Sequence, residues 1–200
     1  MDEKAATRDR ILQAAIARIK HYGYSKTTMA EIASDCDMSP GNIYRFFESK
    51  IDIAEAMVRR HYVEQSAEIS AIARRRDVPV DRRMRQIFTA RMLQAHESLH
   101  RDARLLEVAE ILRRERSLIY KELQAAERAQ LTALIEEGIG SGVFGPGDAA
   151  EKAEMLQLAT LGFAEPHLLF HTSREELERA VNGVLDLVFF GLFDRPQASA

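Results

Sequence analysis

Apolar residues recur at helical spacing along almost the whole chain, and no segment shows the sustained alternation that is typical of a strand. One face of the first such stretch carries Ile11, Ala15, Ile19 and Tyr22, and Gly23 ends it. No hairpin dipeptide stands between apolar runs, and no internal repeat is present. The pattern therefore predicts an all-α protein with about nine helices.

Three short polar segments near the N-terminus predict helix ends. Thr28 and Glu31 have the spacing of a capping box, which predicts a helix that begins after Thr28. After a break at residues 37–38, Ser39 is typical of an N-cap, and Pro40 suits the first position of the next helix. Residues 48–50 form the next polar break. The predicted unit is a helix, a tight turn and a short helix.

The rest of the chain continues in longer helices. One begins near Ile51 and ends before residues 74–79; others are predicted near residues 80–98, 102–114 and 116–138. A glycine-rich loop over residues 138–147 precedes two apolar helices, near 148–170 and 174–193, and Pro166 should kink the first of them. We expect residues 1–50 and 77–200 to form two domains joined by a helix over residues 51–76.

Composition narrows the class of protein. With 46% hydrophobic and 30% charged residues the chain can fold around a core, and a single Cys excludes a disulfide framework. No apolar run is long enough to span a bilayer, and the first residues lack a signal sequence, so we expect a cytoplasmic protein with no membrane partner. Residues 1–76 carry 13 Lys and Arg against 11 Asp and Glu, whereas residues 77–200 carry 15 against 20. This asymmetry predicts different partners for the two parts, in spite of a net charge of −3.

The stretch 27–50 and the helix before it resemble the tetracycline-repressor (TetR) family of bacterial transcriptional regulators. The matching positions are Arg10, Ile11, Leu12, Ala14, Ala15, Gly23, Tyr24, Thr27, Thr28, Ile32, Ala33, Met38, Ser39, Gly41, Tyr44, Phe47 and Lys50. One departure is Asp37, which stands where the family commonly has a glycine with a positive φ. Aspartate tolerates that backbone region better than most residues, so we expect the turn to survive.

The resemblance implies a helix-turn-helix whose second helix enters the major groove of DNA. It assigns phosphate contacts to Thr27 or Thr28, Ser39, Tyr44 and Lys50. It places Pro40, Gly41, Asn42 and Arg45 nearest the bases, where Asn42 suits adenine and Arg45 suits guanine. For Tyr44 the alternative is a packing role, for Arg45 a solvated charge, and for Lys50 a contact with a helix end.

The last two helices are expected to form a homodimer interface, as the resemblance also implies. The final helix is apolar almost all round, which requires cover on both sides, and the preceding helix offers small residues for close packing. The predicted interface residues are Leu158, Gly162, Phe163, Val181, Val184, Leu185, Val188 and Leu192.

A small-molecule effector pocket is implied within residues 80–170. The candidates are Met84, Phe88, Arg91, Met92, His96, Glu107 and Tyr120. Most apolar residues in this region fit an ordinary core equally well, because protein interiors are close-packed. Met84 and Met92 are the apolar candidates that best suit an adaptable binding surface.

Metal and redox chemistry receive little support. The pairs His96/His100 and His167/His171 each lie on one helical face, yet neither has a third ligand fixed by the sequence. Cys36 fits a small buried residue better than a redox sensor. No nucleophile, base and orienting group occur together, so we predict neither a cofactor nor an enzyme.

The resulting hypothesis is a homodimeric, ligand-responsive regulator, most simply a repressor, that binds a near-palindromic double-stranded DNA operator through residues 39–46. Two alternatives were a helical metal-dependent enzyme and a helical interaction protein that does not bind DNA.

Overall fold

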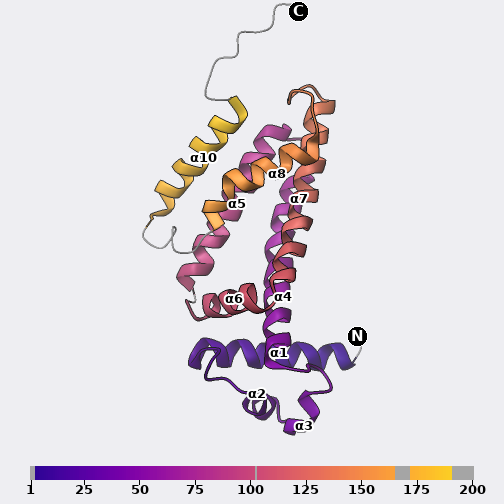
Figure 1. Ribbon diagram of the computed structural model, residues 1–200, viewed down its shortest axis with the longest axis vertical. Helices are drawn as coiled ribbons and strands as arrows, with labels where there is room; N and C mark the ends of the chain where they lie inside the picture. Colours follow the sequence, from indigo (N-terminus) through magenta and orange to yellow (C-terminus); the bar gives the residue numbers. More distant parts are fainter. Residues whose placement is uncertain (1–2, 102, 165–171, 191–200) are drawn as a thin grey trace, which may run out of the picture. The chain divides into compact units, whose positions relative to one another are not determined.

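The computed structural model describes residues 3–101, 103–164 and 172–190, and every regular element in those ranges is helical (Figure 1). Nine α-helices and one 3-10 helix are present there, which confirms the predicted all-α class. The elements are α1 (Glu3–Tyr22), α2 (Met29–Asp35), α3 (Pro40–Ile43), α4 (Lys50–Ala73), α5 (Val80–Arg101), α6 (Ala103–Glu115), α7 (Ser117–Gly140), α8 (Ala149–Thr160), the 3-10 helix η1 (Leu161–Ala164) and α10 (Arg174–Phe190).

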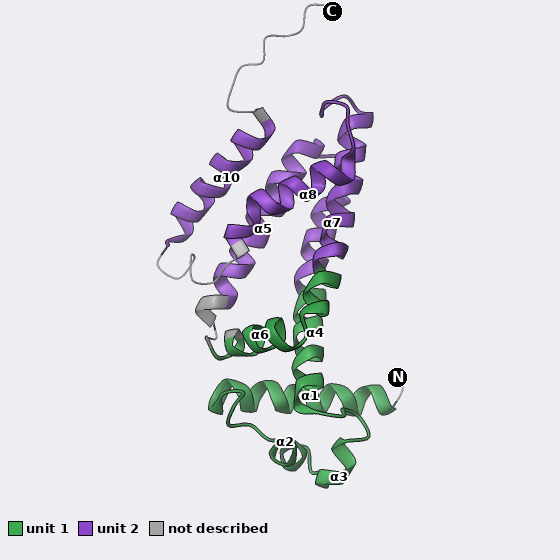
Figure 2. Cartoon of the chain, in the orientation of Figure 1, with its two compact units in different colours: residues 1–64, 101–123 green, residues 65–100, 124–200 purple. Residues whose placement is uncertain are grey.

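The chain divides into two compact units that are discontinuous in sequence (Figure 2). Unit 1 contains Met1–Glu64 and Arg101–Leu123; unit 2 contains Gln65–His100 and Gln124–Ala200. The helix α6 therefore belongs with the N-terminal helices, and α4 supplies residues to both units. The domains expected from the sequence are continuous segments with boundaries at residues 50 and 76. The two structural units are discontinuous, so their boundaries lie elsewhere.

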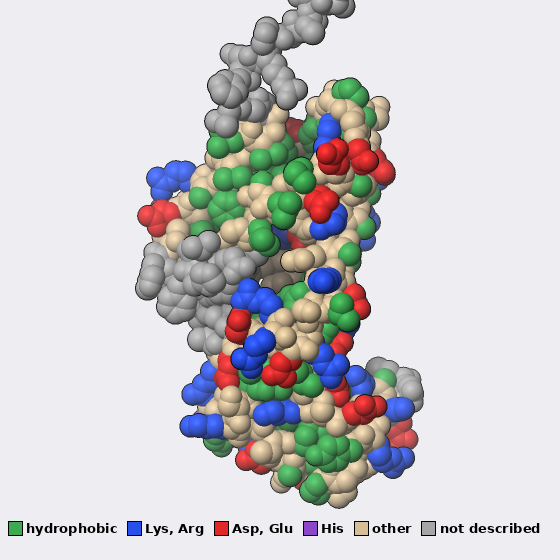
Figure 3. Space-filling view, viewed as in Figure 1, with side chains coloured by type: hydrophobic (Ala, Val, Ile, Leu, Met, Phe, Trp, Pro, Cys, Tyr) green, Lys and Arg blue, Asp and Glu red, His purple; other side chains and the backbone are tan. Residues whose placement is uncertain are grey.

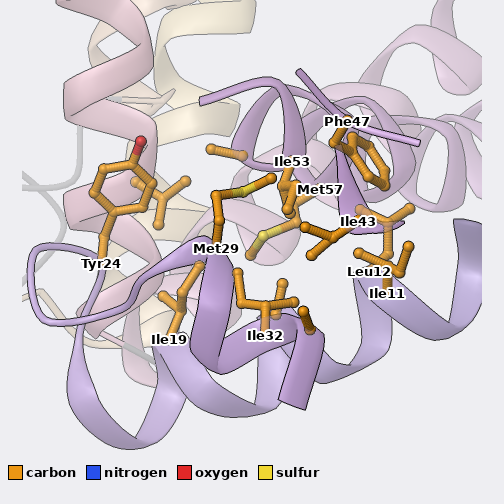
Figure 4. Close-up of a cluster of buried hydrophobic side chains, with 14 of the residues drawn as sticks. Ile11, Leu12, Ile19, Tyr24, Met29, Ile32, Ile43, Phe47, Ile53 and Met57 are labelled. Carbon is orange, nitrogen blue, oxygen red and sulfur yellow. The ribbon is translucent and has the colours of Figure 1, made fainter. Parts of the chain in front are cut away.

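Unit 1 is built around one apolar core to which several helices contribute (Figure 4). Ile11, Ile32, Ile43 and Ile53, from α1, α2, α3 and α4, are all fully buried there. The core also contains Val108, Leu112 and Ile119, from α6 and the start of α7. Burial of this kind stabilises by about 1.5–3 kcal/mol per large aliphatic side chain, so α6 is part of the framework that holds the short helices α2 and α3.

Unit 2 contains a buried arginine that links three helices. Arg83 of α5 is 1% exposed and pairs with Glu137 of α7. Its Nε donates to the carbonyl of Val78 at 2.9 Å, and its Nη1 donates to the carbonyl of Ala73, the last residue of α4, at 2.7 Å. A buried guanidinium is tolerated because every side of it meets an acceptor.

The last two helices differ from the prediction in detail. The α-helix predicted near residues 148–170 ends at Thr160 and continues as the 3-10 helix η1. The expected kink at Pro166 lies outside the described residues. No described helix is both long and apolar enough to cross a membrane.

Candidate nucleic-acid interface

The turn between α2 and α3 depends on Asp37. Its φ is 54°, and among the described residues it is the only non-glycine with a positive φ. The amide of Met38 donates to the carbonyl of Ala33 at 2.9 Å, which closes the end of α2. The sequence-based expectation that aspartate takes the place of glycine in this turn is confirmed.

The helix α3 buries one side and exposes the other. Ile43 and Phe47 point into the core (Figure 4), whereas Ser39, Pro40, Gly41 and Arg45 are exposed and Asn42 is half-buried. Tyr44 is 52% exposed. Ser39 has the backbone of an N-cap but makes no side-chain capping bond, so its hydroxyl has no part in holding the helix.

Gly41 is not required by the packing of this chain. A Cβ atom built there meets no atom within 4 Å, and its φ does not lie in the positive region. Neither the backbone nor the core explains a glycine at this position. A missing side chain on an exposed helix face is what a closely approaching external partner requires.

The turn that follows α3 is fixed by an arginine of α1 that the sequence analysis did not single out. The Nη1 atom of Arg8 donates to the carbonyl of Phe46 at 2.6 Å, and its guanidinium carbon lies 3.9 Å from the centroid of the Phe47 ring. A charge near the N-terminus of a long helix gives no sequence signal for such a distant contact.

Of the two threonines expected at a phosphate, the structure favours Thr28. Thr27 is 1% exposed, and its hydroxyl donates to the carbonyl of Gly23 at 2.8 Å. Thr28 is exposed and caps α2, because its Oγ1 accepts from the amide of Glu31 at 3.3 Å and the Glu31 carboxylate accepts from the amide of Thr28 at 2.9 Å. The predicted capping box is confirmed.

Lys50 makes contacts inside the chain. Its Nζ donates to the carbonyls of Tyr24 and Thr27, each at 2.8 Å, and lies 4.2 Å from the centroid of the Tyr24 ring. Burial lowers the pKa of the ammonium group, although the nearby carboxylates of Glu107 and Glu31 oppose that effect.

The predicted effector residues fall into both units. In unit 2, Met84, Phe88 and Met92 are buried. Arg91 pairs with Glu127, and a ring nitrogen of His96 lies 3.1 Å from the carbonyl oxygen of Thr172.

Glu107 and Tyr120 belong to unit 1 instead. The carboxylate of Glu107 accepts from the hydroxyl of Ser25 at 2.6 Å, and the Tyr120 hydroxyl donates to the carbonyl of Ala109 at 2.8 Å. Both therefore help to hold helices of the DNA-binding half. The predicted seven-residue pocket stays a prediction.

Unit 2 has a pocket of about 540 Å³ whose lining was not predicted. It uses another face of α5 than Met84, Phe88 and Met92, and none of the seven candidates lines it. Most of its lining residues are polar, although apolar atoms form the larger part of its surface. Its walls are formed by Glu68, Arg85, Gln86, Thr89, Ala90, Leu93, Gln94, Glu97, Arg174 and Asn182.

The predicted dimer residues divide into exposed and buried groups. Leu158 is 56% and Val188 44% exposed, Gly162 is exposed, and Phe163 and Val184 are half-buried. Val181 and Leu185 are instead buried within unit 2, because the face of α10 that carries them packs inward. Leu192 lies outside the described residues.

Further apolar side chains extend the exposed group. Met155, Leu161 and Leu187 are all more than two-fifths exposed. Figure 3 shows hydrophobic side chains gathered over α8 and α10. We call Met155, Leu158, Leu161, Leu187 and Val188 the apolar patch.

Metal and thiol sites gain no support. No cluster of three or more potential metal ligands occurs among the residues that the structure describes. The side chain of His100 and the pair His167/His171 lie outside that part. Cys36 is 2% exposed, and burial raises the pKa of its thiol.

A short helix exposed after a tight turn, held by a core from α1, α2 and α4, defines a helix-turn-helix DNA-binding domain. Residues 11–57 match the family model of bacterial regulatory proteins of the tetR family, and residues 80–185 match that of the tetracyclin repressor-like C-terminal domain. The chain belongs to the TetR family of transcriptional regulators. This membership sets the enzyme alternative aside.

Solved structures of similar fold agree with this assignment. The fatty acid degradation regulator FadR from Bacillus halodurans is 20% identical, with a TM-score of 0.68 and coverage of 94% of this chain and 97% of that chain. A TetR/AcrR-family regulator from Thermobifida fusca is 18% identical (TM-score 0.66, coverage 93% and 98%). FadR from Bacillus subtilis, in complex with stearoyl-CoA, is 19% identical (TM-score 0.63, coverage 92% and 98%). A comparison with curated proteins gave no match.

Proposed function

We propose that this regulator is a homodimeric repressor that binds a near-palindromic operator through residues 39–46 and leaves it when a small molecule binds the C-terminal half. The observation that carries the DNA-binding part is the exposed side of α3 and of the turn after it, where a Cβ at Gly41 meets open space and Tyr44 and Arg45 are exposed. Two such helices, about 34–36 Å apart in a dimer, match successive major grooves.

The proposed contacts with the operator are of two kinds: contacts with phosphates, which position the protein, and contacts with base edges, which recognise the sequence. Ser39 and Tyr44 are exposed and carry hydroxyls that suit phosphate oxygens. Thr28 is also exposed, but its hydroxyl donates to the Glu31 carboxylate at 2.8 Å and would have to exchange that bond for a phosphate. Asn42 suits adenine and Arg45 suits guanine, and each bidentate contact discriminates by about 1–3 kcal/mol. The modest positive balance of the N-terminal part means that affinity rests on the paired sites of a dimer.

The effector is a small molecule that binds one state of the dimer more tightly than the other. The pocket in unit 2 has the size of a ligand site. Because one protein of similar fold was solved with stearoyl-CoA, acyl-CoA thioesters belong in the first panel of test compounds. The polar and charged side chains among the pocket's lining residues also call for polar metabolites in that panel.

The test is selection of bound fragments from genomic DNA at low salt. The wild-type chain should enrich a near-palindrome whose half-sites lie one helical turn apart. Tyr44→Ala/Arg45→Ala should stay folded and lose that enrichment. The matched control is Tyr22→Ala/Arg114→Ala, which removes the same side-chain types from exposed positions on α1 and α6. Failure of the wild type to enrich any palindrome contradicts the proposal.

A further inference from the structure

The ammonium group of Lys50 lies where two backbone carbonyls of one loop converge. The loop joins α1 to α2 over residues 23–28. Nζ is 2.8 Å from the carbonyl oxygens of both Tyr24 and Thr27, and the Tyr24 ring lies against it, with its centroid at 4.2 Å. Lys50 is the first residue of α4, so the contact joins the start of α4 to the loop before α2.

The loop over residues 23–28 also has hydrogen bonds of its own, which do not involve Lys50. The amide of Thr27 donates to the carbonyl of Tyr24 at 3.1 Å, and the Thr27 hydroxyl donates to the carbonyl of Gly23 at 2.8 Å. Gly23 has a φ of 88°. The Tyr24 carbonyl thus accepts from the loop's own Thr27 amide and can take Lys50 as a second donor, whereas Lys50 is the donor that the structure places at the Thr27 carbonyl.

A second contact holds the same loop from α6. Ser25 donates to Glu107 at 2.6 Å, and Arg104 donates through Nη1 to the carbonyl of Lys20, near the end of α1, at 3.1 Å. The loop is therefore fixed by α4 on its carbonyls and by α6 on a side chain. Its last residue, Thr28, caps α2, and α2 carries α3 through the Asp37 turn.

We propose that Lys50 is a positioning residue for DNA binding, which holds the loop over residues 23–28 and with it the N-terminus of α2, and that it is not a phosphate ligand. Two of its three N–H groups donate to carbonyls and an aromatic ring covers part of the ammonium group, an arrangement that fixes the side chain toward the loop. The DNA arm of the test rests on the DNA binding proposed above.

The two roles differ in how binding depends on salt. Each phosphate that a lysine neutralises contributes about 0.9 to the slope of log affinity against log salt. A positioning residue leaves that slope unchanged, because the phosphate contacts that remain are the same in number. Its loss instead loosens the loop and lowers affinity at every salt concentration.

The experiment compares Lys50→Met with Lys26→Met, a substitution of an exposed lysine in the same loop. Hydrogen exchange is measured for the amides of residues 24–36, and binding to a 40-base-pair duplex of random sequence is titrated at several salt concentrations. We expect Lys50→Met to speed exchange about tenfold or more and to lower affinity with an unchanged slope. Lys26→Met should leave exchange at the wild-type rate.

Two results overturn the proposal: wild-type exchange in Lys50→Met, or a slope that falls by about 0.9 or more. If Lys50→Met does not fold, Tyr24→Leu replaces it, because loss of the ring should speed exchange in the same segment, with Tyr24→Phe as its control. If the wild type binds no duplex at all, the proposed function fails, while the exchange measurement still decides whether Lys50 holds the loop.

Discussion

At the scale of single residues, the exposed surface around α3 that we propose contacts DNA includes a glycine, Gly41, without a structural role inside the chain. Most side chains of unit 1 are explained by contacts inside the unit, as Arg8 is by Phe46 and Lys50 by the loop carbonyls. Gly41 has no such explanation, since a side chain there meets open space. Other glycines such as Gly140 share that property, so what distinguishes Gly41 is its place next to Ser39 and Pro40 at the exposed start of the second helix of the helix-turn-helix.

Gly41→Leu should therefore damage function and leave the fold intact. Leucine is a better helix former than glycine by roughly 0.5–1 kcal/mol, so the melting temperature should stay at the wild-type value or rise. Operator affinity should fall about tenfold or more, because the new side chain occupies the space that a close approach needs.

Thermal melting and binding to the selected fragment measure the two effects. The matched control is Gly140→Leu at the end of α7, where a Cβ also meets nothing within 4 Å. That variant should bind as the wild type does. Equal binding by Gly41→Leu and the wild type would remove the main support for this proposed DNA-binding surface.

At the scale of elements, α2 is too short to be stable by itself, since it spans seven residues. Both of its ends are held. Thr28 and Glu31 form the capping box, and Arg18 of α1 donates to both oxygens of Asp35 at 2.6 and 2.8 Å. Arg18 also lies 3.2 Å from Glu31, so one guanidinium spans the helix.

This arrangement predicts an acid-sensitive helix. The hydrogen bond from Arg18 lowers the pKa of Asp35, and the bonds from the side chain and backbone of Thr28 lower that of Glu31. A carboxyl whose pKa is lowered in the folded state stabilises above its unfolded pKa, near 4, and this stabilisation is lost as pH falls through the folded value.

Asp35→Asn should consequently lower stability at pH 7 by about 0.5 kcal/mol, and its difference from the wild type should shrink progressively as pH falls below about 4. Thermal melting followed by circular dichroism between pH 7 and pH 3 measures both curves. Glu48→Gln, at an exposed position, serves as the control. Parallel curves for Asp35→Asn and the wild type at all pH values would contradict the prediction.

The elements also show what sequence patterns can and cannot establish. The capping box at Thr28 and the substitution of Asp37 for glycine in a turn are local, so their residues carried the signal. Arg83 is different, because an arginine in a charged segment such as residues 81–85 is usually solvated, and only the fold brings Glu137 to it. Likewise, a stripe on α10 indicated that it is covered, but not that Val181 and Leu185 are covered from within the same unit.

The two candidate sites differ in the same way: the DNA-binding residues are close together in the sequence, whereas the pocket residues are not. The exposed residues of α3 and its flanks lie close together in the chain, between Ser39 and Arg45, and a family resemblance located them. The residues that line the pocket of unit 2 come from α4, α5 and α10. Their meeting depends on which faces of those helices approach, which helical spacing within each one does not determine.

At the scale of the whole molecule, the apolar patch is the main surface without a described partner. Met155, Leu158 and Leu161 follow one another at three-residue spacing over α8 and η1, and Leu187 and Val188 of α10 are also exposed. Large exposed aliphatic groups in such number mark an interaction surface. A second copy of the chain is the partner that a palindromic operator requires.

If the apolar patch forms the proposed dimer interface, Leu158→Glu should weaken self-association, because it introduces a charge among apolar groups that the dimer would bury. Sedimentation should show a dimerisation constant weakened about tenfold or more, while the exposed starting position leaves the fold intact. Val63→Glu, an equally exposed position on α4 in unit 1, should remain a dimer. A fully dimeric Leu158→Glu chain would rule this surface out.

The placement of α6 in unit 1 also limits how this regulator can be recombined. Val108, Leu112 and Ile119 complete the core around the reading helices, although they come after α5 in the chain. A chimera that joins residues 1–76 to a foreign sensor domain would leave part of that core open. A transferable reading module must therefore carry residues 101–123 as a second segment, so that exchange of sensors takes three crossovers instead of one.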